Sequence, residues 1–154
     1  MPNTTFYATA QLQEGMKVTA KSRNCEVTID EPVQMGGTDT GMSPVEILLN
    51  ALGACQAIVA RAYARHFGIE FDDFRVEVAG DLDTDGFMHK SDVRCGFSDI
   101  RYTIHIDTEA PREKVAEFIA FIEKTCPVGD TLANKVKLKL EDFVITSKKQ
   151  ATPV

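Results

Sequence analysis

The sequence predicts one α+β domain in which antiparallel sheets pack around a long central helix. Three observations support this class. Short alternating segments fill the first third of the chain, a long apolar helical stripe follows, and two further alternating segments then come with no helix between them. Strands joined directly pair antiparallel, whereas parallel strands need a helical crossover. The predicted order is βββ-α-ββ-α-β, and a length of 154 residues suits a single domain spanning 1–154.

The first third of the chain is predicted to form three short strands. Residues 5–12 and 16–22 alternate loosely between apolar and polar side chains, with a turn at Glu14 and Gly15 between them. Arg23 and Asn24 interrupt the pattern before a third strand at 25–29. The turn-rich stretch that follows, with three glycines between positions 34 and 41, separates these strands from the central helix.

A long helix is predicted from Pro44 to about His66. Ser43 and Glu46 have the spacing of a capping box, and Pro44 occupies the first helical position. Gly68 is a natural C-terminal cap. Apolar residues recur along this segment at three- and four-residue steps, which is the period of a helix. They are Ile47, Leu48, Ala51, Leu52, Cys55, Ile58, Val59, Ala62 and Tyr63.

The second half is predicted from the same two periodicities. Alternating segments indicate strands, a one-sided apolar pattern after Pro111 indicates a second helix, and Pro127 ends that helix. The predicted elements are a strand at 74–82, a polar loop at 83–91, a strand at 100–106, a helix at 111–125, a short helical turn at 128–134 and a last strand at 136–146.

Composition and charge argue against several classes of partner. A net charge of −6 disfavours a general nucleic-acid binder and a protein that docks on an anionic membrane. No stretch approaches the roughly 20 apolar residues of a membrane span, and the N-terminus lacks the pattern of a signal peptide. We therefore expect a cytoplasmic protein with no membrane partner, in a reducing compartment where structural disulfides rarely persist.

Four cysteines are the candidates for chemistry. Cys55 lies in the apolar stripe, where it is either a small buried hydrophobe or a reactive thiol supported by a cation or donor. Cys126 precedes Pro127, and it is either an ordinary turn residue or the N-cap of a short helix, whose amides would favour a thiolate. Cys25 and Cys95 have no local activating feature. The cysteines are not close-paired, so no metal is expected.

Two segments together resemble the OsmC/Ohr family, named for osmotically inducible protein C and organic hydroperoxide resistance. Residues 41–55, GMSPVEILLNALGAC, are similar to a signature in which Gly-x-(Ser/Asn)-Pro leads through one apolar helix to a cysteine. Residues 125–128, TCPV, are similar to the second motif, a Cys-Pro followed by a small or β-branched residue. The predicted order of elements also fits this family over nearly the whole chain.

The resemblance implies an assembly and a reaction. Family members are intertwined homodimers with two active sites at the subunit interface, and they need no metal, flavin or haem cofactor. Carried over, Cys55 is the peroxidatic cysteine that reduces an organic hydroperoxide, and Cys126 is the resolving cysteine that condenses with the resulting sulfenic acid. A small or protein dithiol then reduces the disulfide by exchange. Such a peroxidase is an antioxidant, stress-response enzyme.

Two positions depart from the family pattern. Its well-characterised peroxidases support the reactive cysteine with an Arg from the first hairpin and a Glu after the helix-opening proline, positions that here fall near Gln13 and at Val45. Glu46 would lie on the opposite helix face from Cys55, ~13 Å away along the axis. Arg23 is the candidate replacement cation, and Glu46 the second supporting candidate. These departures place the chain closer to the YhfA-like branch. They leave two alternatives, a redox-sensing or ligand-binding dimer and an inert structural dimer.

Overall fold

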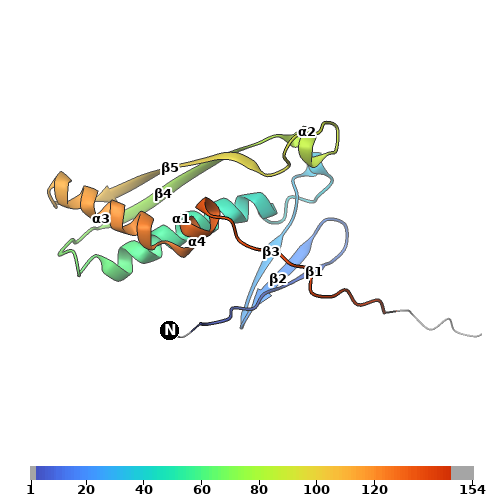
Figure 1. The fold of residues 1–154 in the computed structure, drawn as a ribbon, viewed down its shortest axis with the longest axis horizontal. Coiled ribbons are helices and arrows are strands. Elements are labelled where there is room, and N and C mark those ends of the chain that lie inside the picture. The colour runs from blue at the N-terminus through green and yellow to red at the C-terminus, as the bar shows by residue number, and fades with distance from the viewer. Residues whose placement is uncertain (1–2, 147–154) are drawn as a thin grey trace, which may run out of the picture.

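The computed structural model describes residues 3–146 and confirms the α+β class, with antiparallel sheets and a long central helix (Figure 1). The N-terminal sheet contains β1 (Thr9–Leu12), β2 (Val18–Ser22) and β3 (Cys25–Ile29) in the order β1-β2-β3. Both pairings are antiparallel, and β2 is the central strand. The three predicted strands are therefore confirmed, with slightly later starts for the first two.

The segment between β3 and α1 is held in place by Asp30, whose side chain is buried. Its Oδ2 atom accepts hydrogen bonds from the hydroxyls of Thr38 and Thr40 at 2.6 and 2.9 Å, and from both amides at 3.1 Å. These bonds, the Thr38 hydroxyl first, hold the pKa of Asp30 well below its usual range, although burial opposes them. A short 3₁₀ turn, η1 (Val33–Met35), lies within this segment. The Asp30 contacts thus fix the path of the chain into the central helix.

Helix α1 (Pro44–Tyr63) begins with the predicted capping box. The Glu46 carboxylate accepts hydrogen bonds from the Ser43 amide at 2.7 Å and from the Ser43 hydroxyl at 2.9 Å. The Glu46 amide in turn donates to Ser43 Oγ. Beyond the helix end, Gly68 has a φ of 56°, the left-handed conformation that glycine adopts at low cost.

A long antiparallel hairpin covers one face of α1 (Figure 1). Strand β4 (Asp73–Leu82) pairs with β5 (Phe97–Asp107) along nearly its whole length. Exposure alternates residue by residue along β4, as its sequence predicts. The predicted loop at 83–91 differs, because a short helix α2 (Thr84–Phe87) begins there at an N-cap hydrogen bond that the Asp83 side chain accepts.

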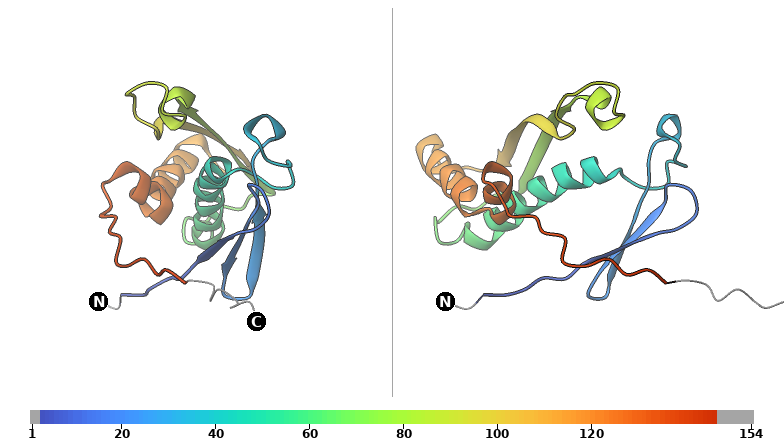
Figure 2. Two further views of the ribbon diagram at one scale, coloured as in Figure 1. Left: turned by 90° about the vertical axis from the view of Figure 1, so that its right-hand side faces the viewer. Right: turned by 45° about the vertical axis from the view of Figure 1, so that its right-hand side comes forward.

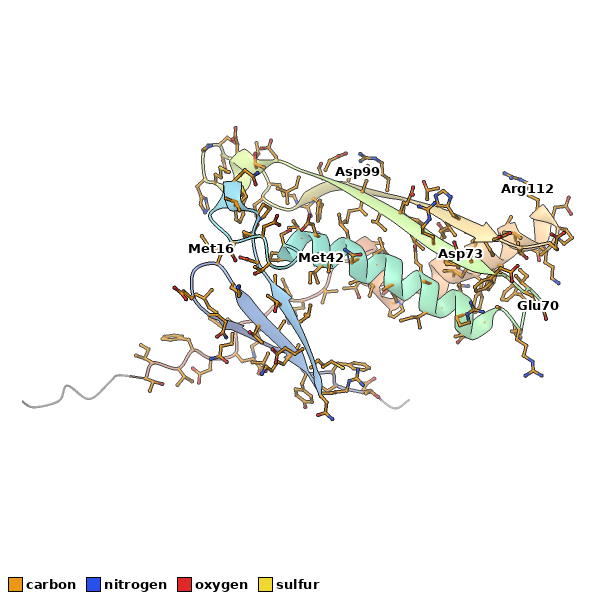
Figure 3. The ribbon with its side chains drawn as sticks, turned by 180° about the vertical axis from the view of Figure 1, so that it is seen from behind. Met16, Met42, Glu70, Asp73, Asp99 and Arg112 are labelled. Carbon is orange, nitrogen blue, oxygen red and sulfur yellow. The ribbon has the colours of Figure 1, made fainter. Side chains whose placement is uncertain are left out.

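Helix α3 (Arg112–Thr125) packs against the C-terminal half of α1 and completes the core. Phe118 and Ile122 are fully buried, which confirms the predicted apolar face of this helix. The buried core residues come from both helices and the α1–β4 connection: Val59, Ala60, Ala64, Ile69, Phe71, Phe118 and Ile122. In Figure 3, Glu70 and Asp73 mark this end of the molecule, and Met42 marks the opposite end of α1, where the N-terminal sheet joins it.

The predicted last strand at 136–146 is wrong for the single chain. Within residues 3–146, no strand pairing involves this segment, which leaves helix α4 (Pro127–Ala133) and runs extended away from the helices (Figure 2). Val136, Leu138 and Leu140 alternate with charged residues, and all three are exposed. Alternation marks a segment suited to pairing, but within the described chain this segment does not pair with the free edge of any strand.

The central helix also corrects the expectation that no segment approaches the length and apolar character of a membrane span. By length and composition alone, α1 is long and apolar enough to cross a membrane. The core helix of a folded domain has the same composition, and Leu52, Val59 and Ala60 of α1 are buried within this domain. Val45, Leu48 and Ile58 of the same helix remain exposed. The side of α1 that carries Ala51, Ala54, Ile58 and Ala62 is exposed in the described chain.

Candidate functional site

Cys126 is the N-cap of α4, as one of the two sequence interpretations predicts. Its Sγ atom accepts a hydrogen bond from the Gly129 amide at 3.3 Å, and Pro127 occupies the first helical position. The residue is 0% exposed. A thiol at this position faces free backbone amides and the positive end of the helix, both of which favour a thiolate. The alternative of an ordinary turn residue is excluded by this geometry.

Opposing effects act on the Cys126 sulfur. Burial is the largest and raises the pKa of Cys126, and the neighbouring Cys55 thiol raises it further through a hydrogen bond and through charge. The amides of Gly129 and Val128 lower it. The net effect is a raised pKa, so the resting side chain is a neutral thiol that must lose its proton before it can act as a nucleophile.

Cys55 lies at the middle of α1 and is partly exposed, whereas Cys126 is enclosed. Helix α4 packs against α1 (Figure 2), and this packing brings the two thiols close enough for Cys55 to act on the Cys126 sulfur. Both cysteines are free thiols in this structure. The structure therefore joins the two cysteines that the sequence motifs single out, from segments 71 positions apart in the printed sequence.

The two supporting candidates do not join this pair within one chain. Glu46 is committed to the α1 capping box, where its bonds with Ser43 lower its pKa, at the helix end remote from Cys55. Arg23 is exposed in the β2–β3 turn, with a φ of 54°, on the sheet that projects away from α1 (Figure 1). Local turn and capping geometry decides both placements. That either residue supports Cys55 stays a prediction, to which the single chain adds no contact between them and Cys55 among its described residues.

A hydrogen-bonded group that the sequence analysis did not identify lies beside the cysteines. The Tyr102 hydroxyl on β5 donates to Glu123 Oε1 on α3 at 2.7 Å. The Gln56 carboxamide on α1 lies near enough to the Tyr102 hydroxyl to lower its pKa, against the net rise. Gln56 is 1% exposed, and its Oε1 atom has no hydrogen-bond partner within residues 3–146. A glutamine within the apolar stripe, directly after Cys55, is the signal that could have identified this group.

These three residues line a groove of about 600 Å³ between α1, β5, α3 and α4. Leu52 and Gly129 line the groove and also border Cys126, because a Cβ placed on Gly129 would lie 3.5 Å from the Cys126 sulfur and 3.7 Å from Leu52. Charged side chains of both signs, among them Arg94, Lys124 and Asp130, stand around it. Among the residues that the structure describes, no group of three or more His, Cys, Asp or Glu side chains could hold a metal ion.

Comparison with known proteins finds a matching family model and two curated relatives that share one name. Residues 37–141 match the family model described as OsmC-like protein. The chain is 29% identical over 132 residues to a protein of Mycoplasma pneumoniae named hydroperoxide reductase, which covers 86% of this chain and 89% of that protein. A protein of the same name from Mycoplasma genitalium is 26% identical over 132 residues, with the same two shares.

Solved structures share the fold. The crystal structure of an OsmC like protein from Mycoplasma pneumoniae matches with a TM-score of 0.75 at 27% identity, and covers 86% of this chain and 89% of that one. An organic hydroperoxide resistance protein from Legionella pneumophila matches with a TM-score of 0.60 at 17% identity, over 86% of this chain and 91% of that one. The second likeness shows the fold alone.

Proposed function

The chain belongs to the OsmC-like protein family, and from this premise we propose that it is a thiol-dependent hydroperoxide reductase. Cys55 is the peroxidatic residue and Cys126 the resolving residue. The observation that carries the proposal is that α4 packs against α1, with a partly exposed Cys55 near enough to a buried, N-capping Cys126 to raise the pKa of its thiol. Both relatives named hydroperoxide reductase cover most of this chain, which supports a peroxide substrate.

The reaction proceeds in three balanced steps. The Cys55 thiolate attacks the terminal oxygen of the hydroperoxide, the O–O bond breaks, and the alkoxide leaves as an alcohol after taking a proton. The Cys126 sulfur then attacks the sulfenic acid at Cys55, the S–O bond breaks, and water leaves. A dithiol finally reduces the disulfide by two successive exchanges, and is itself oxidised to a disulfide.

Exposure sets the order of the two cysteines. The partly exposed Cys55 is open to a substrate. Cys126 is enclosed, so only groups of the protein, such as those on α1, can react with it. Apolar side chains of α1, such as Leu52, surround this position. Burial of an alkyl group against such side chains favours an organic hydroperoxide over hydrogen peroxide, by about 0.8 kcal/mol per buried methylene.

The proposal includes a homodimer. The exposed apolar side of α1 and the unpaired segment 136–146 are two surfaces that a single chain leaves without partners. A second copy has complementary surfaces of the same kind, including the edge strands β1 and β3 of its N-terminal sheet. The same assembly could bring Arg23 of a second copy toward Cys55. A cytoplasmic location belongs to the proposal as well, since a reducing compartment keeps both thiols ready.

The alternative is a redox-sensing or ligand-binding dimer built on the same cysteine pair. One observation favours it. Of the supporting residues expected from the sequence, Glu46 is held in the capping box at the start of α1 and Arg23 is exposed in the β2–β3 turn of the described chain. Without such support the first step would be slow, while disulfide formation would remain possible. The two functions differ in turnover: a reductase consumes many equivalents of peroxide in the presence of a dithiol, and a sensor consumes about one.

The test uses the reduced full-length chain with cumene hydroperoxide and dithiothreitol. We expect continuous peroxide loss in the wild type and none above background for Cys55→Ser. A variant in which the two exposed cysteines, Cys25 and Cys95, are replaced by serine is the matched control and should retain full activity. Undiminished peroxide consumption by Cys55→Ser would exclude the proposed mechanism, and single-equivalent consumption by the wild type would favour the sensor.

A further inference from the structure

The resolving step requires the Cys126 thiol to release a proton inside the protein. The side chain is fully buried and is a neutral thiol at rest. The backbone amides of Gly129 and Val128 stabilise the negative sulfur, but they are donors and cannot accept the proton. The oxygen that leaves the sulfenic acid can accept this proton directly, and the side chains that surround Cys126 offer a second route.

The Tyr102–Glu123 pair has the arrangement that such an acceptor needs. Its 2.7 Å hydrogen bond runs from the phenol to a carboxylate, so the phenol can pass its own proton on while it receives another. Glu123 is exposed and can exchange protons with solvent, whereas Cys126 cannot. Tyr102, Glu123 and Gly129 line one groove, and the amide of Gly129 contacts the Cys126 sulfur.

Tyr102 also responds to charge on the resolving cysteine. Burial and the Glu123 carboxylate are the main causes that raise the pKa of Tyr102, and charge on Cys126 raises it further. Tyr102 and Cys126 therefore influence one another across the groove wall. A negative charge on the Cys126 sulfur favours the protonated form of the Tyr102 phenol. The transferred proton therefore ends on Glu123, and Tyr102 stays a neutral phenol.

Gln56 determines the direction of this hydrogen-bonded chain. Because the Tyr102 hydroxyl donates its single proton to Glu123, the carboxamide can engage the Tyr102 oxygen only as a donor through Nε2. This leaves Oε1 without a partner, as observed. A buried carbonyl without a hydrogen-bond partner destabilises the folded state. Gln56 directly follows Cys55 and keeps this buried oxygen without a partner. Its role is therefore that of a positioning residue rather than of a side chain that only fills the core.

We propose that Tyr102 and Glu123, held in place by Gln56, accept the proton that Cys126 releases when it attacks the sulfenic acid at Cys55. The proton moves through the groove to the Tyr102 oxygen while the phenol proton moves to Glu123. The sulfur electron pair forms the S–S bond, the S–O bond breaks, and the departing hydroxide becomes water by taking a proton from solvent. Glu123 returns its proton to solvent, so protons balance. The inference rests on the proposed function and adds residues to its second step.

The test separates the second step from the first. Reduced protein is mixed with one equivalent of cumene hydroperoxide, and mass spectrometry of quenched samples follows the sulfenic acid at Cys55 and the Cys55–Cys126 disulfide. We expect Tyr102→Phe to form the sulfenic acid at the wild-type rate and the disulfide at least about tenfold more slowly at neutral pH, since general-base catalysis contributes ~10²–10⁴-fold. Glu123→Gln should have a similar effect.

The pH profile distinguishes proton transfer from a structural effect. The deficit of Tyr102→Phe should shrink at alkaline pH, where transient local opening exposes the Cys126 thiol to enough hydroxide for its proton to be lost without the relay. The titratable groups that face Cys126 or its groove from the packed elements are Cys55 of α1, Asp99 and Tyr102 of β5, Glu123 and Lys124 of α3, and Asp130 of α4. Tyr63→Phe removes a hydroxyl from α1 outside the groove and should leave both steps unchanged.

A second oxidant keeps the two proposals independent. Diamide adds to one thiol, and the other thiol displaces it as a hydrazine, so the same Cys126 step can be timed without peroxide. A chain that ignores peroxide but shows the Tyr102→Phe deficit with diamide would refute the reductase and support the relay. Disulfide formation at the wild-type rate in both Tyr102→Phe and Glu123→Gln, across the pH range and with either oxidant, would overturn the relay.

Discussion

The amide of Gly129 donates a 3.3 Å hydrogen bond to the sulfur of Cys126 at the first turn of α4. This bond stabilises a thiolate, but burial of the same sulfur favours the neutral thiol, and burial has the larger effect. Cys126 is therefore protected at rest, and its amides are already in position for the charged state. That balance suits a residue that acts second, after Cys55 has been oxidised.

Replacement of the resolving cysteine should stop the reaction after one step. Cys126→Ser leaves Cys55 able to reduce one equivalent of peroxide, and serine preserves the N-cap of α4, so the fold should persist. We expect a lasting sulfenic acid at Cys55, detected by dimedone labelling and mass spectrometry, and little turnover with dithiothreitol. Turnover equal to the wild type would show that an external thiol resolves Cys55 directly.

Gly129 should tolerate a methyl group. A Cβ at this position would lie 3.5 Å from the Cys126 sulfur, an ordinary contact, and the amide donor is retained. Because alanine is a better helix former than glycine, Gly129→Ala should raise the free energy of unfolding by about 0.5–1 kcal/mol in urea titrations. Gly41→Ala is the contrasting variant, since its Cβ would lie 2.4 Å from the Thr28 carbonyl oxygen and should destabilise the approach to α1.

The core between α1 and α3 should depend strongly on Phe118. This side chain is 0% exposed and packs against Phe67 and the α1 residues of the core. Phe118→Ala should lower the free energy of unfolding by about 3–5 kcal/mol, measured by chemical denaturation. Phe87→Ala, at a largely exposed phenylalanine of α2, is the matched control and should cost far less. Equal losses in the two variants would contradict the described core.

Asp30 should make stability depend on acid pH. Its folded-state pKa lies below its unfolded value, so the carboxylate contributes stability above the unfolded pKa and loses it as pH falls through the folded one. The loss should begin below about pH 4, the ordinary value for aspartate. Thermal unfolding followed from pH 7 to strong acid should show this decline in the wild type. Thr38→Val removes the largest cause of the shift and should weaken the pH dependence.

The apolar side of segment 136–146 should hold the proposed dimer together. Leu138 and Leu140 are exposed in the single chain and alternate with Lys137 and Lys139. Leu138→Asp combined with Leu140→Asp should shift the protein toward monomer in sedimentation experiments, because a charge cannot be buried there cheaply. Lys137→Asp combined with Lys139→Asp alters the opposite side and should preserve the dimer. A monomeric wild type would refute this part of the proposal.

Local rules in the sequence predicted much of the fold and one half of the site. The Ser43–Glu46 capping box, the alternation of β4 and the N-cap at Cys126 each depend on residues within a few positions of one another. Such features survive in the structure because their hydrogen bonds and side-chain directions are set by the backbone itself. The same locality explains the error at 136–146, where the period of a strand is present but no strand of the described chain pairs with the segment.

The cysteine pair shows where local rules end. The sequence by itself determined that Cys55 would lie in an apolar stripe, and it left Cys126 as either an ordinary turn residue or the N-cap of a short helix, which the structure decided for the N-cap. Only the tertiary structure decided that Cys126 is buried, that Cys55 acts on it, and that Gln56, Tyr102 and Glu123 from three elements share one groove. These relationships depend on how α1, β5, α3 and α4 pack. The spacing of residues within one segment does not tell which distant segments come into contact in the fold.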